Sequence, residues 1–90
     1  MNLSIATGKL APRREANPHY HERSDEIYVV LAGSGAVRLG EETFPLRKGD
    51  QVFIPKGKVH SLDNPSAEAL EIMCIAVPAF EGSDFIMAGK

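Results

Sequence analysis

The chain has 90 residues and a mass of 9.8 kDa, which is enough for one small domain spanning residues 1–90. Hydrophobic residues make up 43% of the sequence and charged residues 24%, a composition too apolar for an intrinsically disordered chain. The formal net charge is −2 and the basic residues are scattered, so we expect no nucleic-acid partner.

Membrane and redox signals are both weak in this sequence. No window is apolar for as long as a bilayer-spanning helix requires, and the first residues lack the apolar segment of a signal peptide. The single cysteine, Cys74, can form no internal disulfide. These features predict a cytoplasmic protein with no membrane partner.

Short candidate strands, separated by glycine and proline turns, run along the chain. In order, they are Leu3 to Leu10, Glu26 to Leu31, Ala36 to Leu39, Glu42 to Leu46, Gln51 to Ile54, His60 to Leu62 and Leu70 to Val77. No stretch sustains a helical period with caps at both ends. The pattern predicts an all-β sandwich or barrel.

Two apolar segments near the C-terminus indicate contacts beyond one small barrel. The segment Leu70–Val77 is so continuously apolar that we expect burial on both of its faces, which a single small barrel does not easily provide. The tail after it still carries Phe80, Phe85, Ile86 and Met87, and we expect this tail to pack on the barrel or on another subunit. The sequence therefore predicts a homodimer.

The three histidines of the chain are candidate metal ligands. His19 and His21 are two residues apart, so on a strand both imidazoles point to the same side and can present two nitrogens to one ion. Glu26 follows at an odd offset, and a bend in the polar residues 22–25 can restore the shared direction. In a closed sheet, the later strand that begins at His60 can bring a third imidazole across the interior.

Two longer patterns around these histidines resemble the two motifs of the cupin family. Residues 19–33 fit H-x-H-x4-E-x6-G, and residues 49–64 (GDQVFIPKGKVHSLDN) fit G-x5-P-x-G-x2-H-x3-N. The resemblance implies an antiparallel jelly-roll β-barrel. One position departs from the family pattern, because Arg13 stands where the family has a glycine six residues before the first histidine, and we expect this change to affect a turn at the pocket mouth.

The resemblance also implies a metal site and a range of functions. Its ligands would be His19, His21, Glu26 and His60, holding one divalent transition metal ion per chain. Three imidazoles and one carboxylate suit Fe, Mn, Ni, Cu or Zn better than Ca²⁺ or Mg²⁺. The implied function is a mononuclear metal-dependent enzyme, a dioxygenase, isomerase or lyase, acting on a small oxygenated organic molecule. The alternative is a non-catalytic module that binds a metal or a small ligand, as a sensor does.

Several neighbouring residues have open or structural interpretations. Tyr28 shares the face of Glu26 by strand parity, so its hydroxyl is a candidate catalytic group, and the alternative is an amphipathic core residue. Cys74 and Met73 are expected in the core. Asn64 is expected to support the turn after the second motif.

Overall fold

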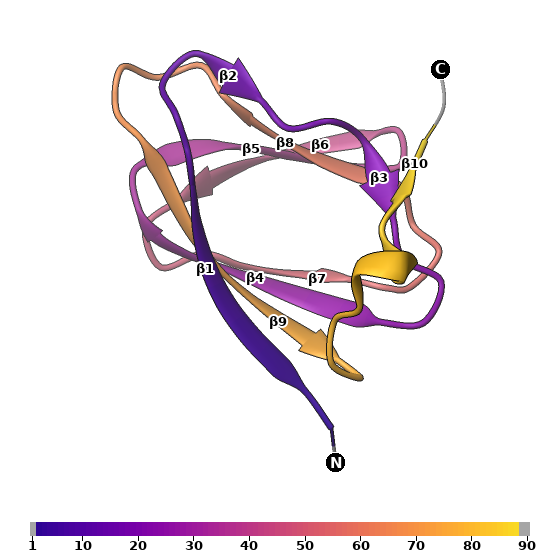
Figure 1. Ribbon diagram of the computed structural model, residues 1–90. Coiled ribbons are helices and arrows are strands. Elements are labelled where there is room, and N and C mark those ends of the chain that lie inside the picture. Colours follow the sequence, from indigo (N-terminus) through magenta and orange to yellow (C-terminus); the bar gives the residue numbers. More distant parts are fainter. Residues whose placement is uncertain (1, 89–90) are drawn as a thin grey trace.

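The computed structural model describes residues 2–88, which form two antiparallel sheets facing each other across a shared interior (Figure 1). The elements are β1 (Ser4–Leu10), β2 (Arg14–Glu15), β3 (His19–Tyr20), β4 (Asp25–Ala32), β5 (Ser34–Leu39), β6 (Glu42–Arg47), β7 (Gln51–Ile54), β8 (His60–Asn64), β9 (Leu70–Val77), the 3-10 helix η1 (Gly82–Asp84) and β10 (Ile86–Met87). The first sheet has the order β1-β9-β4-β7. The second has the order β10-β3-β8-β5-β6, with β2 beside β8.

This arrangement confirms the predicted all-β fold, an antiparallel jelly-roll barrel. Sequence neighbours that pair as hairpins, such as β5 and β6, are joined by tight turns, whereas β4 pairs with the distant β9 and β7. Within residues 2–88, the structure has no helix long and apolar enough to cross a membrane.

The interior of the barrel changes from polar to apolar along its strands. Successive inward side chains of β4 are Glu26, Tyr28 and Val30, because residues two apart share a face of a strand. The apolar end is a cluster of buried side chains: Tyr28, Val30, Val37, Leu46, Ile54, Leu70 and Ile72. The polar end, at Glu26, is therefore held on the same rigid strands as the core.

Strand β9 is more deeply buried on its inward face than on its outward face. Leu70, Ile72 and Ala76 point inward and are buried, whereas Met73 and Ile75 point outward and are half-buried. The outward side chains are covered only by their neighbours on β1 and β4. The expectation of burial on both faces thus holds for the inward face alone, and one apolar sheet face is left half-covered.

The turn at Arg13 has the geometry that a glycine would favour. Arg13 has φ of +62°, in the left-handed region of the backbone that residues other than glycine and asparagine rarely adopt. Its guanidinium Nη1 donates to the carbonyl oxygen of Pro65 at 3.0 Å, which ties the turn to the loop after β8. The departure from the family glycine therefore places an arginine in a strained backbone position.

Asn64 supports the turn after the second motif, as expected. Its side chain is fully buried, and its Nδ2 donates to the carbonyl oxygens of Leu10, Ala11 and Glu68 at 2.8–3.2 Å. Its Oδ1 accepts from the backbone N–H and the hydroxyl of Ser66 at 3.1 and 2.7 Å. This side chain therefore joins the end of β1 to the loop between β8 and β9.

Candidate metal centre

The structure brings the four predicted ligands together at the polar end of the barrel. His19 and His60 are directly paired residues of β3 and β8, and Glu26 lies on β4 of the opposite sheet. His21 follows β3 immediately. All four side chains are buried, and one ligand atom from each lies within 4.8 Å of the others. This cluster could hold a single metal ion.

A bend between His21 and Glu26 gives these two residues their shared direction. The backbone N–H groups of Glu22 and Arg23 donate to the carboxylate of Asp84 at 2.7 and 3.0 Å. The bend that the sequence analysis required is therefore held by the C-terminal segment, which crosses the end of the barrel next to β3 (Figure 1). Sequence reasoning missed Asp84, and its one signal was the apolar tail in which it lies.

Each imidazole is held in the same tautomer by a backbone carbonyl. The Nδ1 atoms pair with carbonyl oxygens as follows: His19 with Asn17 at 3.0 Å, His21 with Asp84 at 2.7 Å, and His60 with Lys58 at 2.9 Å. A carbonyl oxygen only accepts, so each Nδ1 carries the proton and each Nε2 keeps a free lone pair. Metal-binding histidines are typically oriented in this way.

Three buried polar atoms in the centre of the cluster have no hydrogen-bond partner among residues 2–88. Oε1 of Glu26 lies 3.1 Å from Nε2 of His21 and 3.2 Å from Nε2 of His60. Two imidazole lone pairs and a carboxylate oxygen facing one another repel, and an unsatisfied buried polar group costs about 1–3 kcal/mol. A cation among these atoms would satisfy all three, so the residues present fit a divalent metal ion.

Cys74 orients the carboxylate of Glu26. Its thiol donates to Oε2 of Glu26 at 3.2 Å, which leaves Oε1 to face the imidazoles. Burial opposes ionisation of Glu26, and the hydrogen bond from Cys74 favours it. Burial and the charge on Glu26 raise the pKa of Cys74 to about 12, so the group stays a thiol donor. The predicted core cysteine thus packs against the core and contacts a predicted ligand.

Tyr28 lies beside the cluster without facing its pocket. The side chain is buried in the apolar core, and its ring centroid is 5.9 Å from that of His60. The hydroxyl-bearing ring lines a neighbouring cavity of about 300 Å³, which shares Cys74 with the pocket over the four ligands. Burial, helped by the charge of Glu26, raises the pKa of Tyr28, so its hydroxyl keeps its proton. Its catalytic role stays a prediction.

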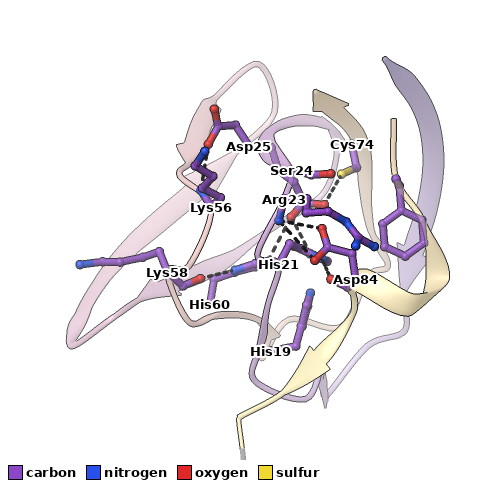
Figure 2. Close-up of polar contacts among 12 residues, drawn as sticks. His19, His21, Arg23, Ser24, Asp25, Lys56, Lys58, His60, Cys74 and Asp84 are labelled. Carbon is purple, nitrogen blue, oxygen red and sulfur yellow. Dashed lines mark hydrogen bonds and ion pairs between the residues drawn. The ribbon is translucent and has the colours of Figure 1, made fainter. Parts of the chain in front are cut away.

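A pocket of about 320 Å³ opens over the ligand cluster. Its lining residues are Ser4, Ala6, His19, His21, Glu26, Cys74, Ala76, Phe80 and Phe85. The ring of Phe85 stacks on His19 with centroids 4.2 Å apart, and Phe80 lies edge-on to His21 at 5.7 Å. Figure 2 shows His19 and His21 next to Asp84 of this C-terminal segment. The predicted packing of the tail on the barrel is confirmed.

The barrel and its histidine–carboxylate cluster define a small β-barrel protein with a cluster that could hold a metal ion. Residues 6–76 match the family model of the cupin domain, and the chain therefore belongs to the cupin family. The predicted family is confirmed.

Two of the similar proteins are an uncharacterized protein and a protein named for binding oxalate. The chain is 41% identical over 69 residues to an uncharacterized protein of Aquifex aeolicus, covering 77% of this chain and 56% of that protein. It is 32% identical over 73 residues to an oxalate-binding protein of Thermotoga maritima, covering 81% of this chain and 60% of that protein.

Solved structures agree with the fold. A crystal structure from Thermotoga maritima, described as a predicted oxalate decarboxylase, is 32% identical with a TM-score of 0.76 and covers 80% of this chain and 63% of that chain. The chain spans about half the length of the curated relatives it first matches.

Proposed function

We propose that this protein is a mononuclear metal-dependent enzyme that acts on a small oxygenated organic molecule. His19, His21, Glu26 and His60 would hold one divalent transition metal ion per chain. The observation that carries the proposal is the set of three buried atoms, two imidazole Nε2 and one carboxylate Oε1, that face each other without hydrogen bonds. A bound ion would act as a Lewis acid toward a substrate oxygen, and Fe, Ni or Cu would also supply dioxygen chemistry.

The chain's own residues orient and shield the reaction. Backbone carbonyls fix the three imidazoles, and the Cys74 thiol fixes Glu26. Among residues 2–88, the polar side chains that line the pocket besides the proposed ligands are those of Ser4 and Cys74. Few protein groups could therefore move a proton in the pocket, which favours a dioxygenase or lyase over an isomerase that needs a base at the substrate.

Tyr28 is the proposed proton donor from behind the ligand cluster. Its raised pKa keeps the hydroxyl protonated, so Tyr28 could donate a hydrogen bond or a proton but would not act as a base. Replacement Tyr28→Phe keeps the ring and removes the hydroxyl, so turnover should fall while metal affinity is retained. If the core alternative is right, turnover by this variant will equal that of the parent chain.

The experiment that tests the proposal begins with the metal content of the untagged chain. We expect one equivalent of a transition metal, measured by plasma mass spectrometry, in protein purified without chelator. Each metallated form is then assayed for oxygen uptake and for release of carbon dioxide over a panel of small organic acids and diols. A chain that binds no transition metal at any stage would overturn the proposal.

A non-catalytic binding module is the second candidate. It is favoured by the name of one relative, the oxalate-binding protein that is 32% identical over 73 residues. The two candidates differ in turnover, because a module would bind oxalate or a similar anion at its metal without converting it. Tight binding with no product over the whole panel would select the module.

We also propose that the chain forms a homodimer through the outward face of the first sheet. A row of apolar side chains crosses all four strands of this face, and paired register places its members side by side: Ile5, Ile75, Ile27 and Phe53. Ile5 is 59% exposed and Phe53 57% exposed, which is more open apolar surface than a small monomer usually keeps in one row.

Sedimentation of the parent chain and of Ile5→Glu tests the dimer. Ile5 lies on an edge strand and is mostly exposed, so its replacement should leave the fold intact and give a monomer. Phe44→Glu changes an exposed side chain of the other sheet and should leave the dimer unchanged. A parent chain that sediments as a monomer at high concentration contradicts the proposal.

A further inference from the structure

We infer that the pocket selects ligands with one oxygen-rich head and one flat apolar body, and that Phe80 and Phe85 form the wall that contacts this body. The inference deepens the proposed function and rests on it, because the head of the ligand would be held at the metal. Phe80 and Phe85 would distinguish such ligands from other small anions.

The pocket has a polar floor and apolar walls. The floor is formed by three members of the ligand cluster, His19, His21 and Glu26. One ligand atom from each lies within 4.8 Å of the others. The walls come from three separate segments, with Ala6 of β1, Ala76 of β9 and the two phenyl rings of the C-terminal segment. Apart from the ligand cluster, Ser4 and Cys74, a ligand entering this pocket therefore meets apolar surface.

Both phenyl rings line the pocket and remain partly exposed. Phe80 is 45% exposed and Phe85 44% exposed, although each packs on a histidine of the cluster. Such rings gain free energy when a flat ligand covers them, and aromatic pairs prefer offset or edge-on contacts with centroids about 4.5–7 Å apart. Their position next to His19 and His21 places a stacked ligand body directly beside the metal-bound head.

No cationic side chain is available for a second charged group of the ligand. Lysine and arginine are absent from the pocket lining among residues 2–88. The nearby Arg23 is engaged by Glu81 at 2.8 Å and by the hydroxyl of Ser83 at 3.1 Å. The side chain of Lys58 points away from the imidazoles (Figure 2). A phosphate or a remote carboxylate would therefore gain no ion pair from the pocket lining and would not cover the phenyl rings.

Three 2-oxo acids with the same head test the inference. They are pyruvate, which carries a methyl group, phenylglyoxylate, which carries a phenyl ring, and 3-phosphohydroxypyruvate, which carries a phosphate. Their dissociation constants are measured on the Co(II)-loaded full chain from the change in its visible absorption. We expect phenylglyoxylate to bind about tenfold or more tightly than pyruvate, as burial of the larger apolar area predicts. We expect 3-phosphohydroxypyruvate to bind no more tightly than pyruvate.

Matched phenylalanine variants assign the preference to the wall. In the double variant Phe80→Ala and Phe85→Ala, the ratio of the pyruvate to the phenylglyoxylate constants should fall to about threefold or less, since most of the covering surface is removed. Because Phe85 and Phe80 also contact His19 and His21, the affinity for Co(II) is measured for each chain, and the two constants are compared at full metal occupancy. Phe44→Ala removes an equally exposed ring from β6, and its ratio should equal that of the parent.

Failure of the inference and failure of the proposed function give different results. A chain that binds no Co(II) overturns the proposed function. A chain that binds Co(II) but has equal constants for phenylglyoxylate and pyruvate overturns the inference alone. Tighter binding of the phosphorylated acid, or a ratio unchanged in the double phenylalanine variant, also overturns it.

Discussion

Two buried polar centres, at Asn64 and at Glu26, lie near opposite ends of the barrel interior and differ in how their atoms are paired. Both polar atoms of Asn64 have hydrogen-bond partners in the loops that it joins. At Glu26, one carboxylate oxygen accepts from Cys74, and the other faces two imidazole lone pairs without a hydrogen bond. Burial is nearly equal, with Asn64 0% exposed and Glu26 4% exposed.

The difference separates a structural polar group from a ligand-binding one. A buried polar group that stabilises the fold finds its partners within the chain, and nearly all such groups in native proteins do. A cluster that leaves converging donor atoms unpaired, on strands that are otherwise well packed, is built for a partner that the chain does not supply. Variants at the two centres should therefore respond to different measurements.

The largest expected effect is on folding, from Asn64→Ala. The change leaves several carbonyl groups without their donor and opens a small cavity, so the free energy of unfolding should fall by about 2–4 kcal/mol. Chemical denaturation of the metal-free chain measures this loss. The control is Asn17→Ala, at an exposed position, which should stay within about 0.5 kcal/mol of the parent. Equal losses for the two variants would contradict a structural role for Asn64.

Glu26→Gln should change metal affinity strongly and folding stability little, the reverse of Asn64→Ala. Glutamine keeps the shape of the side chain, can accept from Cys74 and can donate to an imidazole Nε2, so the metal-free chain should lose no more than about 1 kcal/mol of stability. The only anionic ligand is removed, so affinity for a transition metal should fall about 100-fold, or about 2.7 kcal/mol.

Chelator competition compares the metal affinity of Glu26→Gln with that of Glu42→Gln, a change at an exposed position of β6. The exposed variant should keep the parent affinity. If Glu26→Gln also keeps it, Glu26 is not a ligand, and the unpaired Oε1 atom needs another explanation.

A smaller effect is expected from Asp84→Asn, which changes a residue that positions His21. The carboxylate of Asp84 holds the bend at Glu22 and Arg23, and its carbonyl orients the imidazole of His21. Asparagine keeps one acceptor oxygen but loses the charge that strengthens the two backbone hydrogen bonds. Metal affinity should fall roughly tenfold, as is typical when a group that supports a ligand is changed.

The control for this variant is Asp63→Asn, at an exposed position of β8 that should leave metal affinity unchanged. Equal metal affinities for Asp84→Asn and the parent would show that the charge of Asp84 is not needed. The backbone carbonyl of residue 84 and one side-chain acceptor oxygen would then suffice to hold His21 and the bend.

The sequence predicted the seven longer strands and the cluster of candidate ligands, but it missed β2 and β10 and the contacts that hold the candidate ligands in place. Alternation within β4 and β9 and the glycine and proline turns predicted the barrel, and the spacing of the three histidines predicted the cluster. The bend after His21 was inferred only from the odd offset between His21 and Glu26, which would place them on opposite faces of a regular strand. Its support by Asp84 depends on a contact between residues more than sixty positions apart, which no local pattern encodes.

The outward face of β9 also shows the limit of local patterns. A continuous apolar run cannot distinguish a strand covered on both faces from one whose outer face is half-covered by its neighbours. Likewise, the contact between Cys74 and Glu26 follows from the pairing of β4 with β9. Cys74 pairs with Tyr28 and Ala76 pairs with Glu26, so Cys74 lies diagonally across from Glu26 on the same face. Such contacts become visible only when the register is known.

The smallest expected effect is from Arg13→Gly, which restores the family residue. Glycine relieves the cost of the positive φ at this turn, about 1 kcal/mol for a side chain in the left-handed region, but it increases the freedom of the unfolded chain and loses the hydrogen bond to Pro65. These terms nearly cancel, so the free energy of unfolding should change by less than about 1 kcal/mol. Metal affinity should be unchanged, because the turn joins β1 to β2 and the Arg13 side chain donates its hydrogen bond to Pro65, not to a proposed ligand. A large loss of stability in urea denaturation would mean that the contact of Arg13 with Pro65, and not the backbone conformation, decides which residue this turn accepts.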